Sequence, residues 1–161
     1  MAKERSDAAT SKAHELTITR TFDAPRALVF EMWTRPEHLR RWSCPHGFSI
    51  THNEGELREG GSWRSCMRSP DGKDLWLGGK YREIVKDERL SFTHAWDEAD
   101  GQPGAETLVT VRFEDEGTKT RMVFHQAYFD SAANRDGHQG GWNECFERLD
   151  AVLAQPGAAR A

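Results

Sequence analysis

Residues 137–153, GHQGGWNECFERLDAVL, form the segment around which we expect the rest of the chain to fold. Its large apolar side chains recur at steps of three and four residues, which is the spacing of one broad apolar face on an α-helix. Glu144 and Arg148 fall on the polar side at the i,i+4 spacing of an ion pair. The sequence Gln155-Pro156-Gly157 predicts the end of the helix. The apolar face comprises Trp142, Cys145, Phe146, Leu149, Val152 and Leu153.

Three glycines lie close together in the first part of this segment, at Gly137, Gly140 and Gly141. A glycine inside a helix costs about 1 kcal/mol relative to alanine. The glycines therefore predict a helix start at this point, a kink, or a close approach to another surface. Asp130 or Ser131 is a suitable cap for the start of the final helical region.

The apolar face of this helix needs a partner, and almost everything between Phe48 and Phe129 has strand character. Turn-like sequences at 69–73, 86–88 and 114–117 divide that region into about six antiparallel strands. Another strand is predicted over 15–22, where apolar residues alternate with threonines. Within the strand that starts at Leu75, Gly78 and Gly79 indicate a bulge or a close backbone approach.

Two short helices are predicted between the first strand and the others. Asp23 is the expected cap of the first helix, with Pro25 in its first turn. Pro36 is expected to end that helix and to open the second, which runs through Trp42. The predicted fold is therefore α+β, with a curved antiparallel sheet of about seven strands around a long C-terminal helix and an apolar cavity between them. We expect one domain over 14–154, flanked by disordered tails at 1–13 and 155–161.

Composition excludes some classes of function. The formal net charge of -4 argues against nucleic-acid binding driven by bulk charge. No apolar run approaches the ~20 residues of a membrane-spanning helix. Cys44, Cys66 and Cys145 are odd in number and widely spaced, which predicts free thiols in a reducing, cytoplasmic compartment. Cys44 with His46 and His52 provides fewer ligands than a closed zinc site needs, so we predict no metal and no cofactor.

Aromatic residues are unusually frequent for a polar chain: six tryptophans and eight phenylalanines accompany two tyrosines, at a mean hydropathy of -0.79. Such side chains fill a dense core or line a cavity. His94 and Gln126 alternate with aromatic neighbours, so each either orients a ligand carbonyl or hydroxyl, satisfies a buried backbone group, or lies at the rim of the sheet. His138 is expected at a solvent-exposed helix start or at a cavity mouth. The predicted ligand contacts are Trp33, Trp63, Tyr81, Phe92, His94, Trp96, Phe124, Gln126, Trp142 and Phe146.

A set of short motifs follows the same order as the predicted elements. It comprises FDAP (22–25), Val29-Phe30 with Trp33, PEHL (36–39) with Trp42, GGSW (60–63), GKYREI (79–84), ERLSF (88–92), TLVTV (107–111), TRM (120–122) and GGW (140–142). This ordered set, which runs from about Leu16 to Leu153, resembles the SRPBCC superfamily of START-like and birch-pollen-allergen-like proteins. Within it, the chain is most similar to the AHSA-like branch, named after the activator of the heat-shock-protein-90 ATPase. The resemblance implies a helix-grip fold.

The resemblance implies several activities, because the superfamily includes carriers of lipophilic ligands, resistance proteins, a few enzymes and chaperone regulators, without a shared catalytic set. The first hypothesis is a module that binds a small lipophilic or aromatic molecule in the cavity, without covalent chemistry. The second is an interaction protein, connected with the stress response, that contacts a chaperone ATPase. The third is an enzyme that uses His94, or an acidic loop residue, on a substrate bound in the cavity. A homodimer is predicted if an edge strand or an apolar patch is left uncovered.

Overall fold

The computed structural model describes residues 14–155. The predicted N-terminal tail and residues 156–161 of the predicted C-terminal tail lie outside the described residues. The described part has one strand, two short helices, six further strands and a final helix, as the sequence predicts. The elements are β1 (Leu16–Phe22), α2 (Arg26–Thr34), α3 (Pro36–Trp42), β2 (Ser49–Gly55), β3 (Ser62–Arg68), β4 (Asp74–Val85), β5 (Arg89–Trp96), β6 (Thr107–Glu116), β7 (Lys119–Ala127) and α4 (Ala132–Leu153).

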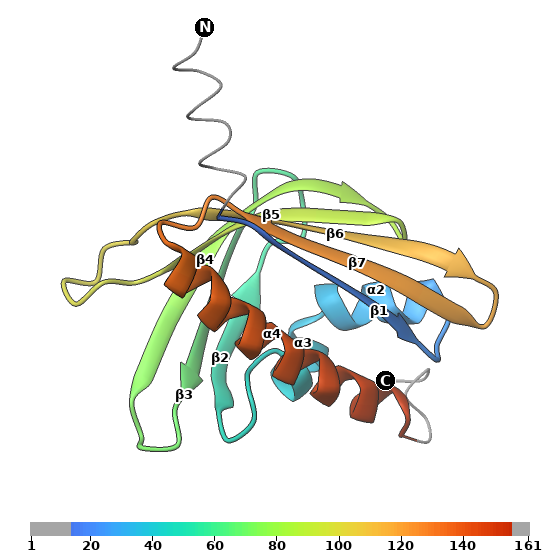
Figure 1. Cartoon of the computed structure of the whole chain (residues 1–161), viewed down its shortest axis with the longest axis horizontal. Coiled ribbons are helices and arrows are strands. Elements are labelled where there is room, and N and C mark those ends of the chain that lie inside the picture. Colours follow the sequence, from blue (N-terminus) through green and yellow to red (C-terminus); the bar gives the residue numbers. More distant parts are fainter. Residues whose placement is uncertain (1–13, 156–161) are drawn as a thin grey trace, which may run out of the picture.

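The seven strands form one antiparallel sheet in the order β1-β7-β6-β5-β4-β3-β2. The sheet curves over α4, and α2 and α3 lie under the same face (Figure 1). Strand β1 precedes the two short helices in sequence but pairs with β7, from Leu16 opposite Gln126 to Phe22 opposite Thr120. This arrangement is a helix-grip α+β fold, in which a curved sheet buries one face of a long helix.

Alternation in β1 has its expected consequence, since Leu16, Ile18 and Phe22 are buried while Thr17 and Thr19 are exposed. The main core lies between the sheet and the three helices. Its largest fully buried apolar side chains include Trp42, Phe22, Phe113, Phe124, Phe146, Met32, Leu90, Met122 and Leu149. Cys44, Cys66 and Cys145 are all buried and unpaired.

Helix α4 begins earlier than the glycines suggest. The Ser131 side chain caps it by accepting a 3.1 Å hydrogen bond from the Asn134 N–H, as one of the two predicted caps. Gly137, Gly140 and Gly141 therefore lie within the helix, and the helix start predicted at this point is wrong. The capped first turn and the packing of the second half hold these glycines in helical conformation.

Of two other predictions about local structure, one is wrong and one is confirmed. Asp23 does not cap the first short helix: Pro25 occupies the cap position without a side-chain hydrogen bond, and its carbonyl accepts from the N–H groups of Leu28 and Val29. Gly79 confirms the close backbone approach, because a Cβ there would lie 1.9 Å from the Thr93 carbonyl oxygen. Of the helices within 14–155, none combines the length and apolar character that spanning a membrane requires.

Candidate functional site

An apolar cleft of about 340 Å³ opens beside the first half of α4. Its walls come from this helix, from the loop after α3, and from strands β3, β4 and β5, so segments distant in sequence meet there. We call it the outer cleft. Among its lining residues, none is Asp, Glu, Lys or Arg. They are Ser43, Pro45, Phe48, Met67, Leu75, Leu77, His94, Trp96, Asn134, Gly137, His138, Gly141, Trp142 and Cys145.

The helical glycines help to keep this cleft open. A Cβ at Gly137 would meet no atom within 4 Å, and one at Gly141 would meet only Pro45, at 3.8 Å. Packing within the chain therefore does not require glycine at these two positions. Glycine lowers helix stability, so these positions carry a cost that packing does not explain. Because glycine has no side chain, it leaves space on this wall of the cleft.

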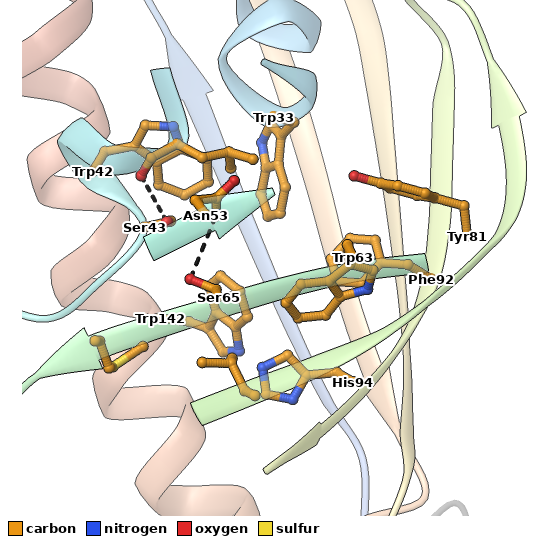
Figure 2. Close-up of a pocket in the computed structure, with 13 residues that line it drawn as sticks. Trp33, Trp42, Ser43, Asn53, Trp63, Ser65, Tyr81, Phe92, His94 and Trp142 are labelled. Carbon is orange, nitrogen blue, oxygen red and sulfur yellow. Dashed lines mark hydrogen bonds between the residues drawn. The ribbon is translucent and has the colours of Figure 1, made fainter. Parts of the chain in front are cut away.

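A second, smaller space lies deeper between the sheet and the helices, and we call it the inner cavity. Its volume of about 60 Å³ is room for roughly two water molecules, each with a share of about 30 Å³. Figure 2 shows aromatic rings from helices and strands surrounding it. Ser43, Met67, Leu77, His94 and Trp142 line both spaces, so the inner cavity adjoins the outer cleft.

His94 lies where the two spaces meet, and only 4% of its surface is exposed. Its ring lies among Trp63, Trp96, Trp142 and His138, with centroid distances of 5.7 to 6.1 Å. No other residue within 14–155 forms a hydrogen bond with this ring. Burial, and to a smaller extent the neighbouring His138, lowers the pKa of His94 to about 3. The imidazole is therefore neutral near physiological pH, and apart from a hydrogen bond to its own backbone the ring has no hydrogen-bond partner among the described residues.

His138, by contrast, has partners at both ring nitrogens. Its Nε2 accepts a 2.9 Å hydrogen bond from the Trp96 indole N–H. Its Nδ1 donates to the Asn134 carbonyl oxygen at 2.8 Å. These bonds fix one neutral tautomer and connect α4 to β5 across the cleft wall. The structure therefore places His138 at the cleft, as one of the two predictions had it, and within the helix rather than at its start.

Gln126 points inward, as its alternation predicts, but its amide is engaged within the protein. It is fully buried, its Oε1 accepts from the Trp142 indole N–H at 2.7 Å, and its Nε2 donates to Thr107 Oγ1 at 2.8 Å. Gln126 therefore positions the Trp142 ring between the two spaces. Trp33 differs from Trp142, because its indole N–H is buried without a hydrogen-bond partner.

Arg148 holds the loop that forms one side of the outer cleft. Its Nη1 donates to the carbonyl oxygens of Cys44, Pro45 and Phe48 at 3.1 to 3.2 Å. The predicted ion pair with Glu144 is wrong, because Glu144 instead accepts from the His46 N–H at 3.1 Å. The loop packs against this side of α4, so its carbonyl oxygens, rather than the Glu144 carboxylate, bind the Arg148 guanidinium. Within the described residues, no cluster of His, Cys, Asp and Glu side chains is arranged to hold a metal ion.

A family model described as "Activator of Hsp90 ATPase homolog 1-like protein" matches residues 23–154, which is most of the chain. The chain belongs to this family. The match spans α2 through α4, so it includes both walls of the outer cleft. No curated protein matches this AHSA1-like chain.

Solved structures with the same fold come from several bacteria. A protein from Chromobacterium violaceum superposes on this AHSA1-like domain with a TM-score of 0.80, at 23% identity over 89% of this chain and 99% of the other. The AHSA1 protein from Silicibacter pomeroyi has a TM-score of 0.80 and 24% identity, over 87% of this chain and 97% of the other. A protein from Arthrobacter aurescens has a TM-score of 0.80 and 28% identity, over 90% and 88%. The first two likenesses concern the fold alone.

The ten predicted contact residues of this AHSA1-like domain fall into three groups. Trp96 lines only the outer cleft, while Phe124, Gln126 and Phe146 are fully buried and line neither space. The remaining six line the inner cavity and are Trp33, Trp63, Tyr81, Phe92, His94 and Trp142. Ligand contact by any of them stays a prediction.

Sequence reasoning missed the aliphatic wall of the outer cleft, which is formed by Met67, Leu75 and Leu77. Met67 pairs directly with Leu75 across β3 and β4, and Ser65 pairs with Leu77. The alternation of Leu75 and Leu77 was a usable signal, because it places both on one face of β4. The predicted contacts were mostly aromatic residues and included none of these aliphatic side chains.

Proposed function

We propose that this AHSA1-like domain binds a small, largely apolar molecule in the outer cleft, without covalent chemistry. The observation that supports this function most is an uncharged cleft of about 340 Å³ next to a buried imidazole to which no other described residue hydrogen-bonds. Ligand pockets are commonly of roughly 300–1,000 Å³, mostly apolar, with a few polar groups that fix orientation. The inner cavity, at about 60 Å³, has room for only a small part of such a molecule.

The chemistry of His94 favours an orienting role over catalysis. A pKa lowered to about 3 by burial makes this imidazole a weak base near neutral pH. The residues that line the two spaces include no carboxylate to orient or charge it. A neutral imidazole in this setting is suited to hydrogen bonding with a ligand.

The test is a titration with N-phenylnaphthylamine, an uncharged probe whose fluorescence increases in apolar surroundings. Gly137→Leu places a side chain in the open cleft, whereas Gly140→Leu adds the same side chain at an exposed helical glycine that does not line the cleft. Both changes replace a helical glycine by leucine, so they have similar effects on helix propensity. We expect saturable binding by the unmodified protein and by Gly140→Leu, with affinity at least tenfold weaker for Gly137→Leu. Equal binding by both variants would place the probe elsewhere.

A second candidate function, contact with an Hsp90-type chaperone ATPase, is favoured by the family's description and by one surface feature. Trp76 on β4 is 38% exposed on a surface strand, with the Arg64 guanidinium 5.2 Å from its ring centroid. Tryptophan and arginine are common anchors of protein interfaces. This candidate requires that the protein raise the ATP turnover of a purified Hsp90, and that Trp76→Ala reduce the effect. A cytoplasmic location and a homodimer through an edge strand, β1 or β2, stay predictions.

A further inference from the structure

We propose, building on the ligand-binding function above, that the natural ligand is an uncharged aromatic molecule of about two rings whose hydroxyl or carbonyl group pairs with His94. The inference concerns the chemical class of the ligand. It depends on three properties of the site: its size, its lack of charge and an imidazole to which no other described residue hydrogen-bonds.

The size of the outer cleft sets the number of rings. An apolar cavity of about 150 Å³ holds one benzene molecule. The outer cleft, at about 340 Å³, is therefore large enough for roughly two fused or linked rings. Trp96 and Trp142 supply flat walls on which aromatic rings pack well.

The residues that line the two spaces disfavour a charged ligand. Neither lining contains Asp, Glu, Lys or Arg among the described residues. The nearest cation on the loop side, Arg148, is engaged by three loop carbonyl oxygens. A carboxylate or ammonium group would leave water here without an opposite charge to replace its hydration, which disfavours charged ligands.

The polar contact is assigned to His94 because the other ring nitrogens that line the outer cleft are already engaged. The indole N–H groups of Trp96 and Trp142 donate to His138 and Gln126, and both nitrogens of His138 have partners. His94, by contrast, has a ring to which no other residue within 14–155 hydrogen-bonds. Figure 2 shows this ring directed from β5 toward Trp142, at the edge of the inner cavity. A ligand oxygen that enters from the outer cleft meets it there.

The His94 imidazole is neutral, and no other described residue hydrogen-bonds to it, so its ring can pair with a ligand hydroxyl. One net hydrogen bond corresponds to roughly a three- to tenfold gain in affinity. An analogue of the same shape that lacks the hydroxyl should bind more weakly by that factor. The difference should vanish when His94 is replaced by phenylalanine, which keeps a flat ring at the same position.

The experiment measures three probes by equilibrium dialysis near neutral pH: naphthalene, β-naphthol, and β-naphthoate, which is an anion under these conditions. For the unmodified protein we expect β-naphthol to bind three- to tenfold more tightly than naphthalene, and β-naphthoate to bind at least tenfold more weakly than β-naphthol. In His94→Phe, β-naphthol should fall to the level of naphthalene, while naphthalene changes less than twofold. Retained naphthalene binding also shows that the variant is folded.

The outcomes separate this inference from the proposed function. If β-naphthoate binds as tightly as β-naphthol, or if β-naphthol loses its advantage on the unmodified protein, the ligand class is wrong while the binding function stands. If β-naphthol keeps its advantage in His94→Phe, the assignment of the polar contact is wrong. If none of the three probes binds, the proposed function itself fails. The comparison of probes on the unmodified protein decides the ligand class even where His94→Phe does not fold.

Discussion

The two halves of α4 differ in what surrounds them. From Cys145 onward, Phe146 and Leu149 have no exposed surface and pack into the main core. Before Trp142, the helix presents Gly137, Gly141 and His138 to an open cleft. One end of α4 therefore stabilises the core, and the other end forms a wall of the outer cleft. This division of roles is physically reasonable, because tight packing of the second half helps to hold in place a first half that borders the cleft.

The largest effect is expected where the helix is fully packed. Leu149→Ala should lower the free energy of unfolding by about 2–5 kcal/mol, because it leaves a cavity in the core. Urea denaturation measures this loss. The exposed Gln139→Ala on the same helix is the matched control, with a change expected within about 0.5 kcal/mol. A small loss for Leu149→Ala would show that the second half of α4 is not the stabilising half.

A smaller effect is expected from His94 as a function of pH. Its pKa is lowered to about 3 in the folded protein, below its ordinary value of 6.5. Between these pH values the His94 side chain is protonated in the unfolded chain but neutral in the folded protein. The contribution of His94 to the free energy of unfolding is therefore fully present above pH 6.5 and is lost as the pH falls toward 3. The slope is at most about 1.4 kcal/mol per pH unit.

Denaturation of the unmodified protein and of His94→Phe, compared between about pH 7 and about pH 5, measures this contribution. The unmodified protein should lose more stability over that interval than the variant does. Identical pH dependence in the two proteins would mean that His94 takes up a proton as easily in the cleft as in the unfolded chain. The space around His94 would then be wetter than its burial indicates.

The smallest effect is expected at the open end of the helix, and it has the opposite sign. Gly137→Ala should raise the free energy of unfolding by about 0.5–1 kcal/mol, because alanine favours the helix and its Cβ meets no atom within 4 Å. Gly79→Ala in β4 is the contrasting control, since its Cβ would collide with the Thr93 carbonyl and the variant should be destabilised. If Gly137→Ala were destabilised, the space beside Gly137 would be filled rather than open.

Much of the fold was predictable because it depends on periodic patterns. The three- and four-residue spacing of Phe146 and Leu149 requires a buried helix face, and the alternation in β1 requires a half-buried strand. His94 and Gln126 point inward for the same reason. What alternation does not specify is the partner that each inward group meets. Gln126 accepts a hydrogen bond from the Trp142 indole, whereas no other described residue hydrogen-bonds to the His94 ring, and only the docking of α4 distinguishes them.

By itself, then, the sequence determined the order of the elements, the faces that they bury and the family to which the chain belongs. Only the tertiary structure decided where space remains. The outer cleft is bounded by Met67 and Leu75 on paired strands, by Gly137 on the helix, and by a loop that Arg148 holds in position. Local patterns specify which side chains leave water, because burial follows from periodicity. A cleft remains where surfaces from distant parts of the chain do not fill the space between them. It therefore exists only after those parts have packed together.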